Sequence, residues 1–422
     1  MLRSSIIELN RRYKTLLSAW LIFLLNPLSA VVVAFNNHRD SYAKNIIWLF
    51  VAYYGYTLVI SNEGMDANRY RDFFISMSYI SYDLNGLLDL VYQDGSNFLD
   101  AAQLFISFFV SRFTGDPRVL FAVFGLIFGY FYSRNIWFLL DRAGGKIKIE
   151  NLIYIVVFAV VIGFWKINGF RMWTAAQIFF FGFFMYIMDG KKIGVLIASL
   201  SLLFHFSFMF PIGMMLLFVI LPKRESWFFG FFIITFFLSE IDIQAFTDKV
   251  TSILPDVFHT RVEGYTSEAY LESTQFRAET KNWRYDAYRL AIKWASTLLF
   301  SVIFFNGSRI LKGKENLRNL LCFSLLMFGS VNFFSNVPAM MRFYPITYLF
   351  VFSFFFIYLQ QAADFRMKKL VLSISLPLLL FYCIGQINTA LMTIGIITLL
   401  GNPIVAVLSD GNFDQAISEI LR

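Results

Sequence analysis

The chain has 422 residues, of which 58% are hydrophobic and 19% aromatic, and its mean hydropathy is +0.62. Soluble domains are only about 45–50% apolar. Here long apolar runs recur from end to end, with the charges confined between them. The composition therefore predicts an all-α, polytopic integral membrane bundle and excludes a soluble domain. The net charge of +8 is spread over short loops, so a nucleic-acid partner is not expected.

The two cysteines, Cys322 and Cys383, lie inside apolar runs and are typical of small core residues. No His, Cys, Asp or Glu spacing suggests a metal site, and no glycine-rich phosphate loop is present. We therefore expect neither a metal nor a cofactor.

Residues 1–15 are basic and suit a short interfacial helix. The rest of the chain predicts about 12–13 transmembrane or half-spanning helices in a single membrane domain, 1–422. The apolar segments in chain order are 16–35, 46–60, 118–140, 152–165, 172–188, 193–221, 226–239, 289–306, 319–337, 343–359, 370–388 and 392–408.

Basic residues are distributed unevenly between the connecting loops. Fourteen Lys or Arg lie in five loops, whereas the two intervening loops, 166–171 and 338–342, carry three. Lys and Arg mark cytoplasmic loops, so we expect the five basic loops inside and the other two outside. The five basic loops are 141–150, 189–192, 222–225, 307–318 and 360–369.

Segment 193–221 has basic residues at both ends, so its two ends should lie on the same side of the membrane. Its length exceeds the ~20 residues of one span and is short for two. This pattern predicts a tight, broken hairpin whose bend lies near the outer face, with His205 and Pro211 flanking the turning point.

The same assignment makes 240–288 a large extracytoplasmic loop with nine acidic and five basic residues. Carboxylates interleaved with aromatic residues, among them Trp283 and Tyr285, suit sugar binding. A folded cap with an ordinary aromatic core is the alternative.

The front of the chain is ambiguous because segment 98–113 is apolar enough to cross half a membrane. If it lies flat, loop 61–97 and the N-terminus are both outside; if it spans, both are inside. The basic N-terminus favours the second arrangement.

Candidate chemistry begins after the second apolar segment, with Asp66, Arg69 and Tyr70 in the run GMDANRYR. Arginine forks bind diphosphate through paired charge-assisted hydrogen bonds. A carboxylate can act as a general base or hold a neighbouring arginine. The alternative is a solvated helix start, with Asp66 as the N-cap.

Two more side chains that can carry a positive charge lie in segments apolar enough to enter a membrane. The run Asn168-Gly169-Phe170-Arg171 opens an apolar helix, where an anion would meet free backbone N–H groups. The alternative is an arginine that snorkels to the headgroups. His205 lies among apolar neighbours, which is more typical of a packing residue. Because a charge at the bilayer centre costs at least about 2.5–3.5 kcal/mol, both Arg171 and His205 are functional-site candidates.

Arg342 stands at the start of a late apolar segment and is the third arginine expected near an outer helix end. Together the three arginines, Asp66 and His205 outline a site for an anionic, membrane-embedded substrate.

Five short motifs follow one another over roughly residues 17–360. They are Asp66 with Tyr70, Asp116-Pro117, Asn168-Gly169-Phe170-Arg171, Leu203-Phe204-His205-Phe206-Ser207 and Arg342-Phe343. In this order they resemble the EpsG-like branch of the Wzy-type polysaccharide polymerases. The resemblance implies that loop 61–97, within an extracytoplasmic stretch 61–117 that includes an amphipathic helix, lies outside.

The resemblance implies a multi-pass glycosyltransferase of the bacterial inner membrane that joins undecaprenyl-diphosphate-linked oligosaccharide repeats. Arg171, Arg342 and Arg69 would stabilise charge on the leaving diphosphate. Asp66 or His205 would take the acceptor proton, with Asp66 preferred and His205 on the diphosphate or orienting the acceptor. Membrane lipid and a chain-length regulator protein are the other expected partners.

Two alternatives remain open. A flippase for the same lipid-linked repeats would share the size and the cationic residues, but would have short outer loops and two related halves. An O-antigen ligase or another membrane transferase is the second alternative.

Overall fold

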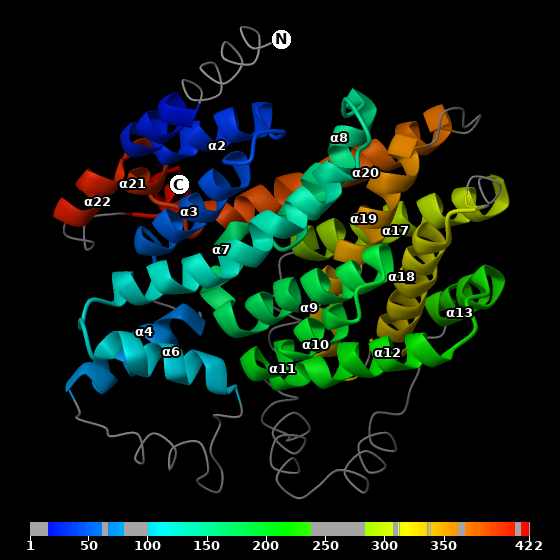
Figure 1. Ribbon diagram of the computed structural model, residues 1–422, viewed down its shortest axis with the longest axis horizontal. Helices are drawn as coiled ribbons and strands as arrows, with labels where there is room; N and C mark the ends of the chain where they lie inside the picture. Colours follow the sequence, from blue (N-terminus) through cyan, green and yellow to red (C-terminus); the bar gives the residue numbers. More distant parts are fainter. Residues whose placement is uncertain are drawn as a thin grey trace, which may run out of the picture.

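The computed structural model describes residues 16–60, 66–79, 100–237, 283–306, 311, 313–335, 337, 339–361, 368–409 and 415–421. Over these ranges the chain is helical, with a single isolated β-bridge between Gly395 and Ala416. Figure 1 shows the helices gathered into one bundle. The predicted all-helical membrane bundle is confirmed. Residues 1–15, residues 61–65 and 80–99 of the predicted loop 61–97, and residues 240–282 of the predicted loop 240–288 lie outside the described residues. Residues 283–288, with Trp283 and Tyr285, were predicted as loop but form the start of the helix Trp283–Asn306.

The helices are α2 (Pro27–Asn36), α3 (Ala43–Tyr56), α4 (Asp66–Tyr79), α6 (Ala101–Ser111), α7 (Pro117–Asp141), α8 (Leu152–Val161), α9 (Phe170–Asp189), α10 (Ile193–Ser199), α11 (Ser201–Phe204), α12 (Met209–Ile220), α13 (Glu225–Phe237), α17 (Trp283–Asn306), α18 (Glu315–Phe333), α19 (Tyr344–Gln361), α20 (Lys368–Leu391), α21 (Ile396–Leu400), α22 (Pro403–Leu408) and α23 (Ile417–Ile420). Short 3₁₀ turns are η1 (Ile149–Asn151), η2 (Phe164–Gly169), η3 (Phe206–Phe208) and η6 (Met340–Phe343).

Five helical stretches in the described ranges are long and apolar enough to cross a membrane. Shorter apolar helices account for further predicted segments, so the bundle combines full spans with half-length pieces. The five long stretches are Pro117–Asp141, Ile149–Asp189, Trp283–Phe305, Met340–Gln361 and Leu372–Leu391.

The centre of the bundle is α19, in which every residue from Ile346 to Gln360 is buried. A helix that is apolar on all sides is stable only inside a larger assembly. Its Phe350 packs on Phe323 of α18 at 4.8 Å between ring centroids, and Phe323 packs on Phe183 of α9 at 4.5 Å. This aromatic core fixes α9, whose first turn carries Arg171.

The segment 193–221 forms the predicted broken hairpin. The helix stops at His205, whose backbone is extended (φ −155°, ψ 116°), and resumes through η3 into α12. Phe204 contacts Phe170 at the start of α9, at 5.9 Å between centroids, and Phe218 contacts Phe183 further along the same helix at 6.0 Å. The chain therefore runs along α9 toward its start as α10 and α11, turns at His205, and returns toward the end of α9 as α12.

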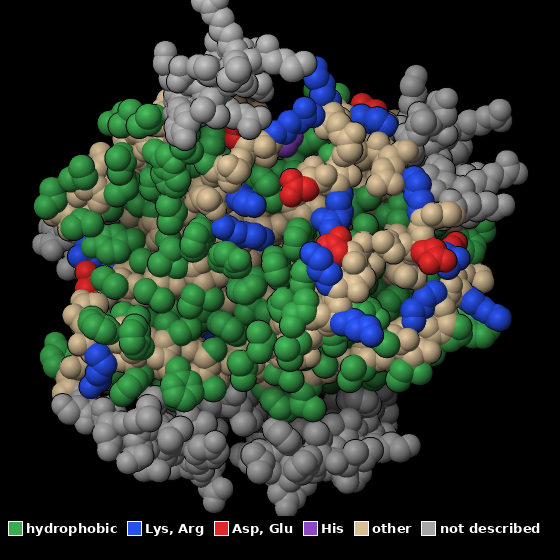
Figure 2. Space-filling model, viewed as in Figure 1, with side chains coloured by type: hydrophobic (Ala, Val, Ile, Leu, Met, Phe, Trp, Pro, Cys, Tyr) green, Lys and Arg blue, Asp and Glu red, His purple; other side chains and the backbone are tan. Residues whose placement is uncertain are grey.

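The described parts of four of the five basic loops lie at one end of the bundle. Arg142 pairs with Asp189, and Asn316 donates to the carbonyl of Met188 at 2.7 Å. The loop 141–150 and the end of α19 are joined by Gln360, whose side-chain amide donates to the carbonyl of Lys146 at 2.8 Å. Figure 2 shows one face of the molecule in the view of Figure 1. On this face most Lys and Arg side chains lie toward the right and top, and hydrophobic side chains cover a broad area beside them.

The predicted apolar segment 392–408 is not one span. It is divided into α21, with 5 residues, and α22, with 6 residues, by Gly401 and Asn402. At 1.5 Å per residue neither piece reaches the roughly 30 Å of a bilayer core. Side chains from early in the chain bond backbone carbonyls of α21. The Tyr53 hydroxyl of α3 donates to the carbonyl of Ile397 at 2.6 Å, and the Asn26 side-chain amide donates to that of Leu399 at 2.9 Å. The segment is thus a broken element packed against α3.

The predicted segment 98–113 is described from residue 100 onward and forms α6, with 11 residues. Its length is about 16 Å at 1.5 Å per residue, too short for a full span. Gln103 and Ser107 are buried toward the protein, whereas Phe105 and Phe109 are exposed on the outside. This inverted pattern suits a helix that presents its apolar face to lipid.

Candidate functional site

Asp100 lies at the centre of a buried polar cluster. It directly precedes α6 and its side chain is 2% exposed. Its Oδ1 accepts the backbone N–H of Phe206 at 2.8 Å. Its Oδ2 accepts a guanidinium N–H of Arg171 at 3.1 Å and lies 2.8 Å from Nδ1 of His205. One carboxylate therefore joins the starts of α6 and α9 to the bend of the broken hairpin.

Arg171 is held from a second side by Tyr70 of α4. Its Nε donates to the Tyr70 hydroxyl at 3.1 Å, and the guanidinium carbon lies 5.6 Å from the centre of the phenol ring. Burial raises the pKa of the Tyr70 phenol to about 12 against the opposing charge of Arg171. Tyr70 is therefore neutral at physiological pH and keeps its own O–H as a donor. The Arg171 side chain remains 26% exposed, so part of its guanidinium group can reach a ligand.

The carboxyl group of Asp100 is ionised in this setting. Burial by itself would raise the pKa of the Asp100 carboxyl, but the hydrogen bond and charge of His205, the Phe206 N–H and Arg171 lower it below its ordinary value. A carboxylate that accepts several hydrogen bonds favours its charged form in this way. The cluster thus contains a fixed negative charge between two cation-capable side chains.

Asp66 lies beside this cluster, at the first residue of α4. A Cβ placed on Gly169 would be 3.9 Å from Oδ2 of Asp66 and 2.9 Å from Nε1 of Trp173. The Asp66 carboxylate is therefore near the start of α9 and is exposed. The structure brings together Asp66, Tyr70 and Arg171 of the predicted residues, and His205 joins them through Asp100.

Sequence reasoning missed Asp100 and Lys166. Asp100 stood at the start of an ambiguous apolar segment, and the only signal was a carboxylate facing a membrane-grade run. Lys166 of η2 was counted only as a loop charge. Its ammonium lies 5.4 Å from the centre of the Trp173 ring, in the same region as Gly169. In the described ranges no acidic side chain forms an ion pair with Lys166.

The other predicted residues take no part in the hydrogen bonds and ion pairs described above for the cluster. Arg69 is exposed on α4, and Asn168 is half-buried in η2. Trp283 and Tyr285 are 71% and 52% exposed at the start of α17. Arg342 is half-buried in η6, and its role stays a prediction.

The turn that carries Arg342 lies against the broken hairpin. The ring of Phe343 is 6.1 Å from that of Phe208, three residues beyond His205. Within the described part of the chain, no three His, Cys, Asp or Glu side chains are grouped so that they could hold a metal ion. The groups that do meet are suited to binding an anion and moving a proton.

The model of the EpsG family matches residues 45–395, a span that contains the whole cluster. The chain belongs to the EpsG family. Membership and the apolar helices together place it among the membrane proteins of polysaccharide biosynthesis. No curated protein and no solved structure matches the chain.

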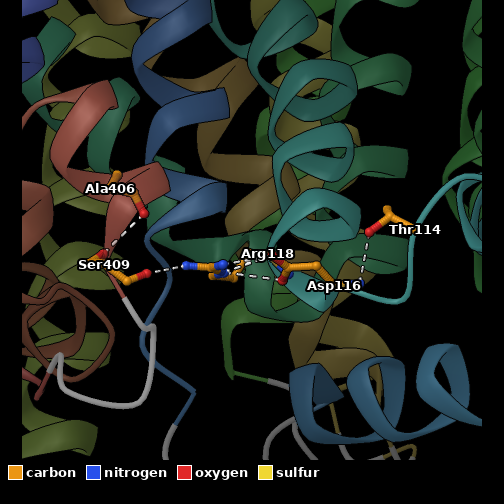
Figure 3. Close-up of polar contacts among 5 residues, drawn as sticks. All are labelled: Thr114, Asp116, Arg118, Ala406 and Ser409. Atoms are coloured by element: carbon orange, nitrogen blue, oxygen red, sulfur yellow. Dashed lines mark hydrogen bonds and ion pairs between the residues drawn. The ribbon is translucent and has the colours of Figure 1, made fainter.

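In this EpsG-family protein the acidic-proline pair has a structural role. Asp116 is the N-cap of α7 and accepts the N–H of Arg118 at 2.9 Å. Figure 3 shows the Arg118 side chain extended between the Asp116 carboxylate and the carbonyl of Ser409, to which it donates at 2.7 Å. The ion pair of Arg118 with Asp116 thus links Ser409, at the end of the broken C-terminal segment, to the start of α7.

Replacing Arg118 with glutamine should lower stability and leave the chemistry intact. The variant loses a charge-assisted hydrogen bond to a carbonyl and a half-exposed ion pair, so a cost of about 1–2 kcal/mol is expected. The thermal midpoint of the purified protein in detergent measures it. Arg71→Gln is the matched control, because Arg71 pairs with the exposed Asp72 next to it. Equal losses in both variants would show that the link to Ser409 contributes nothing.

Proposed function

We propose that this protein is a repeat-unit polymerase, which transfers a growing oligosaccharide from its undecaprenyl diphosphate carrier to the next lipid-linked repeat. The observation that carries the proposal is the convergence of Tyr70 in α4, Asp100 just before α6, Arg171 in α9 and His205 at the bend of the broken hairpin. Family membership supplies the polysaccharide context. The cluster supplies cations for a diphosphate and a group for a proton.

The location of the cluster supports action at the outer face of the inner membrane. The basic loops, joined through Arg142 and Asp189, mark one end of the bundle, and such loops are retained in the cytoplasm. Arg171 begins α9 and Asp189 ends it, so the cluster lies at the opposite end. A carrier whose sugars face outward would reach the cluster there.

The proposed reaction is a direct displacement. An acceptor hydroxyl attacks the anomeric carbon of the donor sugar, the new C–O bond forms, and the bond to the diphosphate oxygen breaks with its electron pair. Negative charge grows on the leaving diphosphate. Arg171 stabilises this charge, with Tyr70 as a neutral donor and Lys166 as a second cation nearby. Arg342 is proposed to approach the same diphosphate from η6.

The first experiment compares surface polysaccharide in three strains: wild type, a deletion of this gene, and the deletion complemented with the wild-type gene. A polymerase predicts that the deletion makes a single-repeat product and that complementation restores the ladder. Loss of the single-repeat band as well would favour a flippase, because export would fail before polymerisation. An unchanged ladder in the deletion would contradict both.

A reaction with purified protein separates polymerase from ligase. The protein in detergent is given a lipid-linked repeat as the only sugar substrate. Formation of lipid-linked dimers and longer chains, with release of the free lipid diphosphate, is the expected result. A protein that extends the repeat only when lipid A core is added would be a ligase, and the proposal would fail.

A further inference from the structure

His205 is oriented by its contacts with Asp100. Nδ1 of the ring lies 2.8 Å from Oδ2 of Asp100, and the N–H of the next residue, Phe206, binds Oδ1 of the same carboxylate. The ring and the backbone of one turn thus bind one side chain. The His205 side chain is 12% exposed, so the ring has little room to rotate.

The partners of Asp100 settle which ring nitrogen carries the proton. An ionised carboxylate can only accept hydrogen bonds. Because the Asp100 carboxylate is charged, Nδ1 of His205 must be the donor. In the neutral ring the second nitrogen, Nε2, then carries a lone pair and is a proton acceptor.

We propose that Asp100 is a positioning residue that makes Nε2 of His205 the general base of the transferase. This inference rests on the proposed function. The acceptor hydroxyl gives its proton to Nε2 as its oxygen bonds to the anomeric carbon, and the electron pair of the broken bond leaves with the diphosphate. The imidazolium then returns its proton to water. Asp100 stays ionised throughout and stabilises the ring while it is positive.

The surroundings of His205 favour this role over binding the diphosphate. Among the described residues, the charged and titratable groups that face it are Asp100 from the start of α6 and Arg171 from α9, with Tyr70 of α4 behind Arg171. Arg171 already supplies a permanent positive charge. Asp66, the base preferred from sequence, is exposed and has no comparable fixed partner among the described residues.

Asp100→Asn tests the positioning role in the purified polymerisation assay. Asparagine keeps the shape but removes the charge, and can present an N–H to Nδ1, which selects the wrong tautomer. We expect the turnover number to fall by at least about 100-fold, with a much smaller change in KM for the lipid-linked donor. Asp72→Asn, at an exposed carboxylate, should change neither quantity.

A double variant separates positioning from a merely structural role. His205→Gln alone should remove most of the turnover. It should also remove the acidic limb of the pH–rate profile, which is the fall in rate at low pH. Because Asp100 also holds Arg171, adding Asp100→Asn to His205→Gln should still remove the part of the turnover that depends on this contact. If Asp100 acts mainly through His205, that further loss should be much smaller than the loss that Asp100→Asn causes in the wild-type background. A full additional loss in the double variant would overturn the inference.

His205→Gln keeps the inference testable if the Asp100 variant fails to fold. Retention of both turnover and the acidic limb in His205→Gln would show that His205 is not the base. Failure of wild-type protein to polymerise the repeat is a different result, because it would remove the proposed function and not this assignment alone.

Discussion

Replacing Arg171 with alanine is expected to slow chain extension by about 10²–10³-fold, the usual cost of losing one preorganised group at a developing charge. The guanidinium is fixed by Tyr70 at 3.1 Å and by Asp100 at 3.1 Å before any substrate arrives. Its orientation therefore does not have to change as the diphosphate gains charge. On a gel, this loss should reduce the ladder to the single-repeat product.

Arg171→Lys distinguishes charge from geometry. Lysine keeps the positive charge but cannot contact Tyr70 and Asp100 together while presenting a planar fork to a phosphate. We expect its rate to lie between those of wild type and Arg171→Ala. Arg71→Ala removes an arginine from α4 outside the cluster and should leave the ladder intact. Full activity in the lysine variant would show that only charge matters.

The measurement must exclude unfolding. Asp100 keeps the hydrogen bonds of Phe206 and His205 when Arg171 is removed, so its charge is not left unpaired. The thermal midpoint should therefore fall less than the activity does. An Arg171→Ala protein that is folded and fully active would contradict the proposed site.

Two of the predicted residues that the structure joins through Asp100 share a property that sequence can reveal. Arg171 and His205 are polar groups in membrane-grade segments, and their cost in lipid indicates a partner. The fold of 193–221 was predictable because both ends are basic and the length fits neither one span nor two. These are local properties of the chain.

The partner itself was not predictable. Asp100 is 71 residues from Arg171 and 105 from His205, and no local pattern links such distant positions. The break in 392–408 was missed for a related reason. Hydropathy predicts a span there, while the side chains that bond its backbone, Tyr53 and Asn26, come from positions more than 300 residues earlier in the chain. Both features depend on tertiary packing.

The close packing of α3 against α7 leads to the second large expected effect. A Cβ at Gly125 would lie 2.4 Å from the carbonyl oxygen of Val51 and 2.9 Å from Cα of Ala52. Gly55 approaches α7 equally closely, since its Cβ would lie 2.1 Å from the carbonyl oxygen of Phe121. Small residues allow such backbone approach in membrane bundles, and backbone atoms cannot move aside as a flexible side chain can.

Gly125→Ala should therefore destabilise the folded protein by at least about 2 kcal/mol, because a single methyl group forces two helices apart. The same change at Gly230 of α13 provides the control. No atom lies within 4 Å of a Cβ there, so alanine should be neutral or stabilise by about 0.5–1 kcal/mol through its helix propensity. Thermal midpoints in detergent should move in opposite directions.

The same variant should also lower activity in the protein that remains folded. Phe124, next to Gly125, stacks on Phe170 with 3.9 Å between ring centroids, and Phe170 directly precedes Arg171. Separation of α7 from α3 changes the position of this stack and hence of the guanidinium. Equal midpoints for Gly125→Ala and Gly230→Ala would show that the α3–α7 contact is adaptable, and the rigid support assigned to Arg171 would then have to come from α9 and α19 alone.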